Sequence, residues 1–175
     1  MSDASKHLAR RRRAAKKYRP ARVELLLVAE APPCDTDRYF YFEDVPSHDW
    51  LFRYVWEGLT GEKPMREEKR THLGALRDAG VFLIDLHEGN IAKPKAADLA
   101  PEVPNLVERC AELEPQSIVL IKSVVYDVSF AALLGAGLAV IDARMPFPAS
   151  GQQKKFLEIF RDAIATSGFE LGTLA

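Results

Sequence analysis

The stretch that decides the fold is VELLLVAEAPP, residues 23–33. Its apolar run contains a single charge and is too short for a helix, which predicts a strand buried on both faces. Pro32 and Pro33 prevent a helix from following and lift the chain away from the sheet. Open α/β folds bind ligands at the carboxyl ends of parallel strands, so we expect residues 30–33 to form one wall of a site. The alternative is an ordinary exit from a strand into a loop, without chemistry.

Further apolar runs predict strands at 81–86, 117–121 and 138–141, in addition to the strand at 23–29. Helices are expected at 5–19, 47–60, 65–79, 102–113, 123–134 and 151–167. Because strands and helices alternate, the connection rules favour a parallel sheet with helices on both faces. The predicted fold class is therefore α/β, a three-layer α/β/α sandwich around a four-stranded parallel sheet.

The composition is that of an ordinary soluble globular domain. Of the 175 residues, 47% are hydrophobic and 28% are charged. No window is long and apolar enough for a membrane span and the start lacks an apolar signal core, so we expect a cytoplasmic protein. An Arg-rich start also resembles an organellar transit peptide, which is the alternative. Cys34 and Cys110 lie too far apart for a metal-spaced pair, and we expect no metal cluster and no cofactor.

The charges are distributed unevenly along the chain. Residues 1–22 contain nine basic residues and one acid, although the whole chain has a net charge of −1. We therefore divide the chain into a basic N-terminal helix or arm, residues 1–22, and an acidic α/β domain, residues 23–175. A basic arm suits a polyanion partner such as DNA. A solvated N-terminal helix that aids solubility is the alternative.

Polar and unusual residues gather in the loops after the predicted strands, at 30–46, 85–92, 122–123 and 142–152. Parallel strands bring such loops to one edge of the sheet, where rigid scaffolds often carry function. The first loop contains YFYF at 39–42, and a loop cannot easily bury four rings, so one or two should face a cavity or the surface. The helix after it should begin at Ser47, end at Gly61 and have Trp50 on its apolar face.

The motifs in these loops resemble those of the uracil-DNA glycosylase superfamily over residues 23–165. AEAPPC at 29–34 is similar to the family motif GEAPG at the end of the first strand. FLID at 82–85 stands where the family has a strand that ends in Asn, and MPFPAS at 145–150 stands where it has HPSPLS. The resemblance implies an α/β/α fold and hydrolysis of the N-glycosidic bond of a base flipped out of DNA.

Several positions depart from the family pattern. The water-positioning Asp, where the family has it, falls on Ala31, and the catalytic His falls on Met145, which cannot donate a hydrogen bond to a leaving base. The Ser that binds a phosphate falls on Phe147, and the Leu wedge falls on Ala149, which is too small to fill a vacated base stack. Asp85 replaces Asn: when ionised it only accepts hydrogen bonds, which suits a base with amino or imino donors unless burial keeps it protonated.

Glu30 is the first candidate for positioning a water, and His87 is the second. The base-binding candidates are Ala31, Pro32, Phe40, Phe42, Asp85, Met145 and Phe147, with either Phe40 or Phe42 as the ring that stacks on the base. The candidates for binding the DNA backbone are Lys122, Ser123, Ser150, Gln152 and Lys154. Purely structural roles, as solvated loop residues, helix caps or loop packing, are the alternatives for these residues.

We therefore expect a DNA-glycosylase-like hydrolase that acts as a monomer on a damaged or deaminated base in single- or double-stranded DNA. Two alternatives stay open. One is a catalytically inactive module of the same fold that binds nucleic acid or a nucleotide. The other is a hydrolase of small nucleosides.

Overall fold

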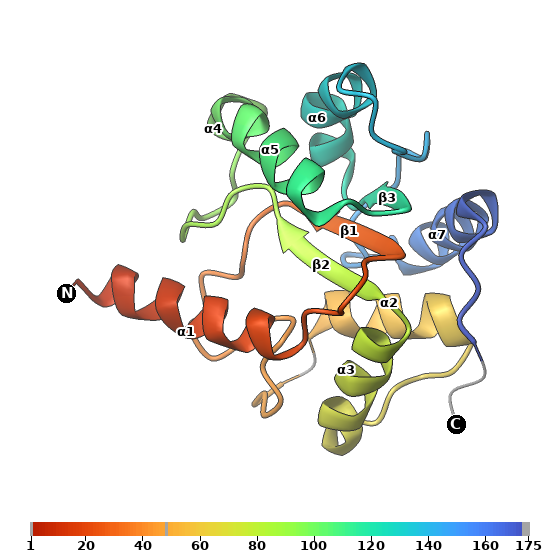
Figure 1. Ribbon diagram of the computed structural model, residues 1–175. Coiled ribbons are helices and arrows are strands. Elements are labelled where there is room, and N and C mark those ends of the chain that lie inside the picture. The colour runs from red at the N-terminus through yellow and green to blue at the C-terminus, as the bar shows by residue number, and fades with distance from the viewer. Residues whose placement is uncertain (1, 48, 173–175) are drawn as a thin grey trace.

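The computed structural model describes residues 2–47 and 49–172. Helices and strands alternate along most of the chain (Figure 1). Their bounds are α1 (Asp3–Lys17), β1 (Leu25–Ala29), α2 (Trp50–Thr60), the 3-10 helix η1 (Arg66–Glu68), α3 (Lys69–Asp78), β2 (Val81–Asp85), α4 (Ala96–Leu99), the 3-10 helix η2 (Ala100–Glu102), α5 (Val103–Leu113), β3 (Ser117–Leu120), α6 (Ser123–Gly135) and α7 (Gln153–Ser167).

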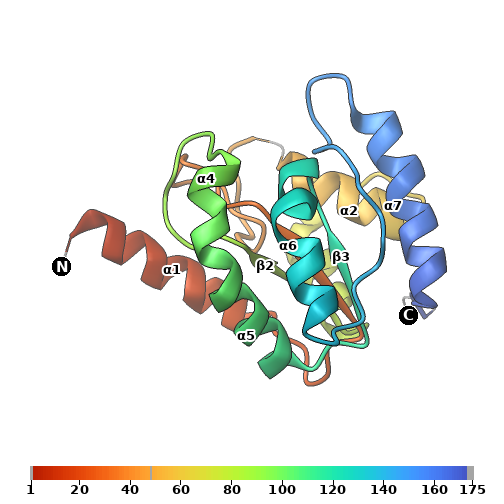
Figure 2. The same ribbon diagram turned by 90° about the horizontal axis from the view of Figure 1, so that it is seen from above.

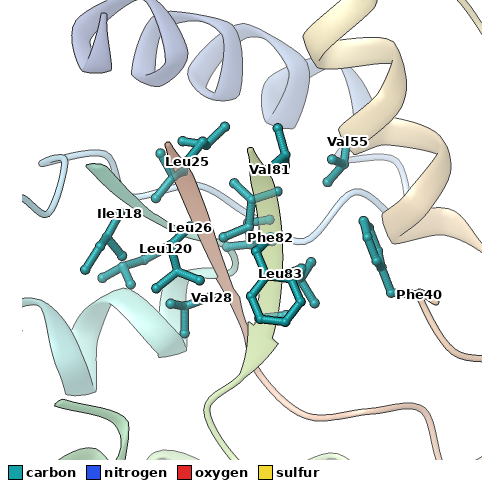
Figure 3. Packing of buried hydrophobic residues seen from close by; sticks show 14 of the residues in the cluster. Leu25, Leu26, Val28, Phe40, Val55, Val81, Phe82, Leu83, Ile118 and Leu120 are labelled. Carbon is teal, nitrogen blue, oxygen red and sulfur yellow. The ribbon is translucent and has the colours of Figure 1, made fainter. Parts of the chain in front are cut away.

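The sheet is parallel and has the strand order β2-β1-β3. In register, Leu25 faces Val81 on one side and Ser117 on the other. The central strand β1 is buried along its whole length, as the apolar run predicted. Helices α2, α3 and α7 lie on one face of the sheet, and α4, α5 and α6 lie on the other (Figures 1 and 2). Figure 3 shows the apolar side chains of the strands filling the space between these helices.

The prediction of a fourth strand at 138–141 is wrong. In the described part of the chain this segment makes only an isolated parallel bridge, between Val140 and Ile118. The N–H of Val140 donates to the carbonyl of Leu138, and the N–H of Ala143 donates to that of Ile141. These local bonds bend the backbone and occupy groups that a longer ladder would need, so within residues 2–47 and 49–172 the parallel sheet has three strands.

The N-cap of helix α2 lies two residues later than predicted. Asp49, not Ser47, is its N-cap, and its Oδ1 accepts a hydrogen bond from the N–H of Phe52 at 3.2 Å. The helix ends at Gly61 as predicted, with the left-handed φ of 79° that glycine adopts without strain. None of the helices in the described ranges is long and apolar enough to cross a membrane.

All four rings of the aromatic segment 39–42 are buried, with 3–7% of each residue exposed. The hydroxyl of Tyr41 is buried against the free edge of β2, where its polar group finds partners. It donates to the carbonyl of Leu83 at 2.7 Å and accepts from the N–H of the same residue at 2.6 Å. One side chain thus pairs both backbone groups that a neighbouring strand would otherwise have to pair.

Helix α1 lies beside the free edge of β2 (Figures 1 and 2) and is docked by polar contacts. The buried guanidinium of Arg11 donates to Oδ1 of Asn90 at 2.8 Å and to the carbonyl of Glu88 at 3.0 Å. Next to the end of the helix, the ring of Tyr18 stacks on that of Tyr41. Arg11 therefore belongs to the packing of the protein, while other basic side chains of α1 are exposed.

We predict that Tyr41→Phe destabilises the protein by about 1–3 kcal/mol, because it leaves the backbone groups of Leu83 buried without their partner. Urea denaturation measures the loss. Tyr54→Phe is the matched control, since the hydroxyl of Tyr54 makes no hydrogen bond within residues 2–47 and 49–172. Equal stability of Tyr41→Phe and the parent protein would show that water replaces the hydroxyl at this edge.

Candidate functional site

A cavity of about 280 Å³ lies at the carboxyl edge of the sheet. Its walls are the end of β1 with residues 30–33, the aromatic residues Tyr39 and Phe40, the start of α2, the end of β2, and Lys122 with Phe147. This volume is near the lower end of the range of small-molecule sites, roughly 300–1,000 Å³. The expected position of the site, beside residues 30–33, coincides with this cavity.

Glu30 and Lys122 form an ion pair in the cavity wall. Glu30 follows β1 and Lys122 follows β3 by two residues, and because these strands are neighbours the two side chains meet, with Nζ 2.5 Å from Oε2. The other carboxylate oxygen, Oε1 of Glu30, is buried and has no hydrogen-bond partner within the described part of the chain. Buried acceptors are normally paired, so a water or a polar ligand atom is expected at Oε1.

The backbone of Lys122 supports this arrangement at some cost. Its φ of 83° and ψ of 133° lie in a region that residues other than glycine rarely adopt. Such a conformation costs roughly 1–3 kcal/mol and persists only where the surroundings hold it. The strained residue is the one that brings an ammonium group to Glu30, at the N-cap of α6.

Asp85 is the last residue of β2 and is buried in the wall of the same cavity. Burial raises the pKa of its carboxyl to about 7, although the nearby guanidinium groups of Arg11 and Arg109 lower it. Both protonation states are therefore populated near neutral pH. The protonated form offers a donor and an acceptor, as an Asn amide does, and the ionised form offers acceptors only.

A second cavity, of about 410 Å³, lies between α1, β2 and α5 and shares Asp85 with the first. Its charged walls include Arg11, which bonds to the loop after β2, and Arg109. The guanidinium of Arg109 donates to the carbonyls of Asp85 and Leu86, both at 2.9 Å. Both arginines thus hold the backbone at and after Asp85 in place, and Asp85 lines both cavities.

Among the aromatic candidates, Phe40 lines the first cavity. Phe42 does not: its ring packs edge-on against Tyr39 and is covered by the guanidinium of Arg10, 4.2 Å from the ring centroid. Figure 3 shows Phe40 beside Val55 of α2, at the border of the core. The structure thus distinguishes two rings that the sequence left as alternatives.

In the last predicted loop, Phe147 lines the cavity together with the other predicted base-binding residues Ala31 and Pro32. Met145 is fully buried and stands outside the cavity wall. The hydroxyl of Ser123 donates to the carbonyl of Met145 at 3.2 Å. The hydroxyl of Ser123 therefore fastens this loop to the start of α6, which is a structural role.

The remaining predicted residues lie away from the cavity. Nδ1 of His87 accepts a hydrogen bond from the N–H of Gly89 at 3.1 Å, so His87 stabilises a turn and does not line the wall. Ser150, Gln152 and Lys154 are exposed around the start of α7. The exposure of these three residues agrees with the alternative interpretation, in which they are solvated surface residues.

Sequence reasoning missed Arg38, Tyr39, Asp49 and Trp50 as cavity residues. Trp50 was assigned to the apolar face of its helix, but 41% of it is exposed. Its position in the first turn of α2, next to the carboxyl edge, was the only available signal.

No known family model matches this sequence, and a comparison with curated proteins found no match. Within the described ranges, no three His, Cys, Asp or Glu side chains are grouped so that they could hold a metal ion.

We predict that Asp85→Asn becomes more stable relative to the parent protein as the pH rises. The carboxyl has a pKa raised from 3.8 to about 7, so between these values the folded protein holds a proton that the unfolded chain has released. The stability of the parent therefore falls through this window, while the Asn variant lacks this loss. The relative gain should be on the order of 1–4 kcal/mol, measured by urea denaturation at several pH values.

The control for this titration is Asp127→Asn. Arg144 lowers the pKa of Asp127, so its contribution to stability has the opposite sign and is lost as the pH falls. Parallel pH profiles for Asp85→Asn and the parent would contradict a raised pKa at Asp85.

Proposed function

We propose that this protein is a DNA-glycosylase-like hydrolase that cleaves the N-glycosidic bond of a damaged or deaminated base flipped out of DNA. The observation that carries the proposal is the unpartnered Oε1 of Glu30 in a cavity that also holds the ring of Phe40 and the carboxyl of Asp85. A positioned water, a stacking surface and a group that reads the base edge are what this reaction requires. The resemblance of residues 29–34 and 145–150 to glycosylase motifs supports the same conclusion.

The reaction passes through a transition state that resembles an oxocarbenium ion. Oε1 of Glu30 accepts a hydrogen bond from a water and directs its oxygen to the sugar carbon. The bond from that carbon to the base nitrogen breaks as the water oxygen bonds to the carbon, and the base leaves with the electron pair and takes up a proton from solvent. The proton of the attacking water passes to Glu30 or to solvent. Lys122 holds the Glu30 carboxylate through Oε2, which leaves Oε1 available.

Asp85 is the group that reads the edge of the base in this proposal. In its ionised form it accepts from an amino or imino donor of the base but cannot donate to one of its carbonyl oxygens. In its protonated form it takes over the donor and acceptor of the Asn that the glycosylase motif has at this position. The choice of base therefore depends on the protonation state of Asp85.

A second candidate function is a binding module of the same fold that lacks catalysis. Two observations favour it: Met145 stands where the family has its catalytic His, and His87 lies outside the cavity. Binding without release of any base is the property that distinguishes this candidate from the first. A hydrolase of small nucleosides is the third possibility, and it does not require a strand of nucleic acid.

We predict that the parent protein releases one base from a panel of oligonucleotides containing uracil, hypoxanthine, xanthine or mismatched thymine, in single and double strands. Glu30→Gln should reduce the rate at least about 100-fold, because the amide cannot take up a proton from the attacking water. Binding of the same oligonucleotide should persist. High-resolution electrophoresis after cleavage of the abasic site measures release.

The matched control is Glu158→Gln, an exposed position on α7 outside the cavity, which should keep the parent rate. A parent rate in Glu30→Gln would refute the role of Glu30. Tight binding with no release from any substrate would favour the inactive binding module.

The exposed basic side chains of α1 are proposed to bind the DNA backbone. Arg13 and Lys16 are exposed, and their side chains make no ion pair or hydrogen bond within the described ranges. Replacing both with Ala should weaken DNA binding and reduce the slope of log K against log salt by about 1 per lost phosphate contact. Titration of a labelled oligonucleotide at several salt concentrations measures the slope. An unchanged slope, equal to that of a Lys63→Ala control, would exclude α1 from the interface.

A further inference from the structure

One large apolar side chain is exposed at the mouth of the cavity. The exposed large hydrophobic residues in the described ranges are Trp50, Met65 and Leu134, and of these Trp50 contributes to the cavity wall. About two fifths of Trp50 is open to solvent although it stands in the first turn of a helix that packs on the core. A large aromatic ring left at the entrance of a site is a common feature of ligand recognition.

The ring of Trp50 is held in a fixed orientation. Tyr54 lies one turn further along α2, and its ring is stacked with that of Trp50 at an interplanar angle of 5° and a centroid distance of 6.0 Å. The guanidinium of Arg53 lies 5.9 Å from the Trp50 centroid and 5.6 Å from the Tyr54 centroid. The result is a pair of parallel rings with a positive charge beside them.

The turn that carries this pair is anchored at its start. Asp49 caps α2 through Oδ1, and its Oδ2 lies 3.5 Å from Nζ of the buried Lys69. The same ammonium group donates to the carbonyl of Tyr39 at 3.2 Å, in the aromatic segment that also lines the cavity. Trp50 therefore stands at a fixed position relative to Phe40 inside the cavity.

We propose that Trp50, supported by Tyr54 and Arg53, stacks on the base next to the one that enters the cavity, and that the substrate is single-stranded DNA. This inference rests on the proposed function and specifies its substrate. Aromatic side chains bind single strands because every base offers a flat face, and a cation beside them attracts the phosphates. A base stacked on Trp50 cannot stay stacked within a duplex, so an unpaired strand is preferred. The small Ala149 agrees with this, because a single strand leaves no base-pair gap for a wedge to fill.

The test uses the full-length protein and an undamaged, labelled single-stranded deoxythymidine oligonucleotide of about 10 nucleotides, at fixed salt. Trp50→Ala should bind it roughly 5- to 150-fold more weakly, and Trp50→Phe should retain most of the affinity. Leu134→Ala, which shortens an exposed apolar side chain on α6, is the control and should bind as the parent does. A duplex of the same length should bind more weakly than the single strand, and its affinity should change little in Trp50→Ala.

Tryptophan fluorescence gives a second readout. The protein has two tryptophans, Trp50 at the surface and the buried Trp56, which stacks on His72. Binding of the oligonucleotide should quench the emission of the parent, and this quenching should be absent in Trp50→Phe although that variant still binds. A free thymidine nucleoside should bind the parent and Trp50→Ala equally, because it has no neighbouring base.

Parent-like affinity of Trp50→Ala for the oligonucleotide would overturn this inference and leave the proposed hydrolysis of a flipped base unaffected. An equal loss in Leu134→Ala would also overturn it. Failure of the parent to bind any oligonucleotide would overturn the inference together with the proposed action on DNA. If the parent releases a base and Trp50→Ala binds the oligonucleotide as tightly as the parent does, the proposed hydrolysis stands and the stacking role of Trp50 is rejected.

Discussion

The pairing of β1 on both sides is the constraint on which the rest of the structure depends. Its five residues have at most 3% of their surface exposed, and every position is covered by a neighbouring strand or a helix. Neighbouring strands lie about 4.8 Å apart, so the residues at their carboxyl ends come close together whatever their side chains are. Glu30, Asp85 and Lys122 stand at or just beyond these three ends, which places two carboxyl groups and an ammonium group around one small volume.

The free edge of β2 is closed by side chains instead of a fourth strand. Tyr41 bonds both backbone groups of Leu83, and Arg109 bonds the carbonyls of Asp85 and Leu86. An open edge of a sheet invites pairing with other chains, and side chains that occupy its hydrogen-bonding groups prevent this. The same contacts fix the end of β2, so the protection of the edge and the position of Asp85 have a common cause.

The strands 23–29, 81–86 and 117–121 were predictable because each is a local apolar run, and Glu30 and Asp85 followed from their ends. Features that depend on tertiary contacts could not be predicted from the sequence. The orientation of Phe40 and Phe42 depends on Tyr39 and Arg10, and the exposure of Trp50 depends on which face of α2 meets α7. Residues 138–141 have a strand-like composition, but local hydrogen bonds decide their backbone. Asp49, not Ser47, caps α2, and its carboxylate also contacts Lys69, which comes from a distant part of the chain.

The positive φ of Lys122 restricts how this position can change during evolution. Glycine would relieve the strain but would leave the partly buried carboxylate of Glu30 without its counter-ion. An apolar or small polar side chain would keep the strain and lose the charge as well. Each of these substitutions therefore removes the ion pair, and a lineage that changes Lys122 is expected to change Glu30 at the same time. The two positions, 92 residues apart in the chain, are therefore expected to change together.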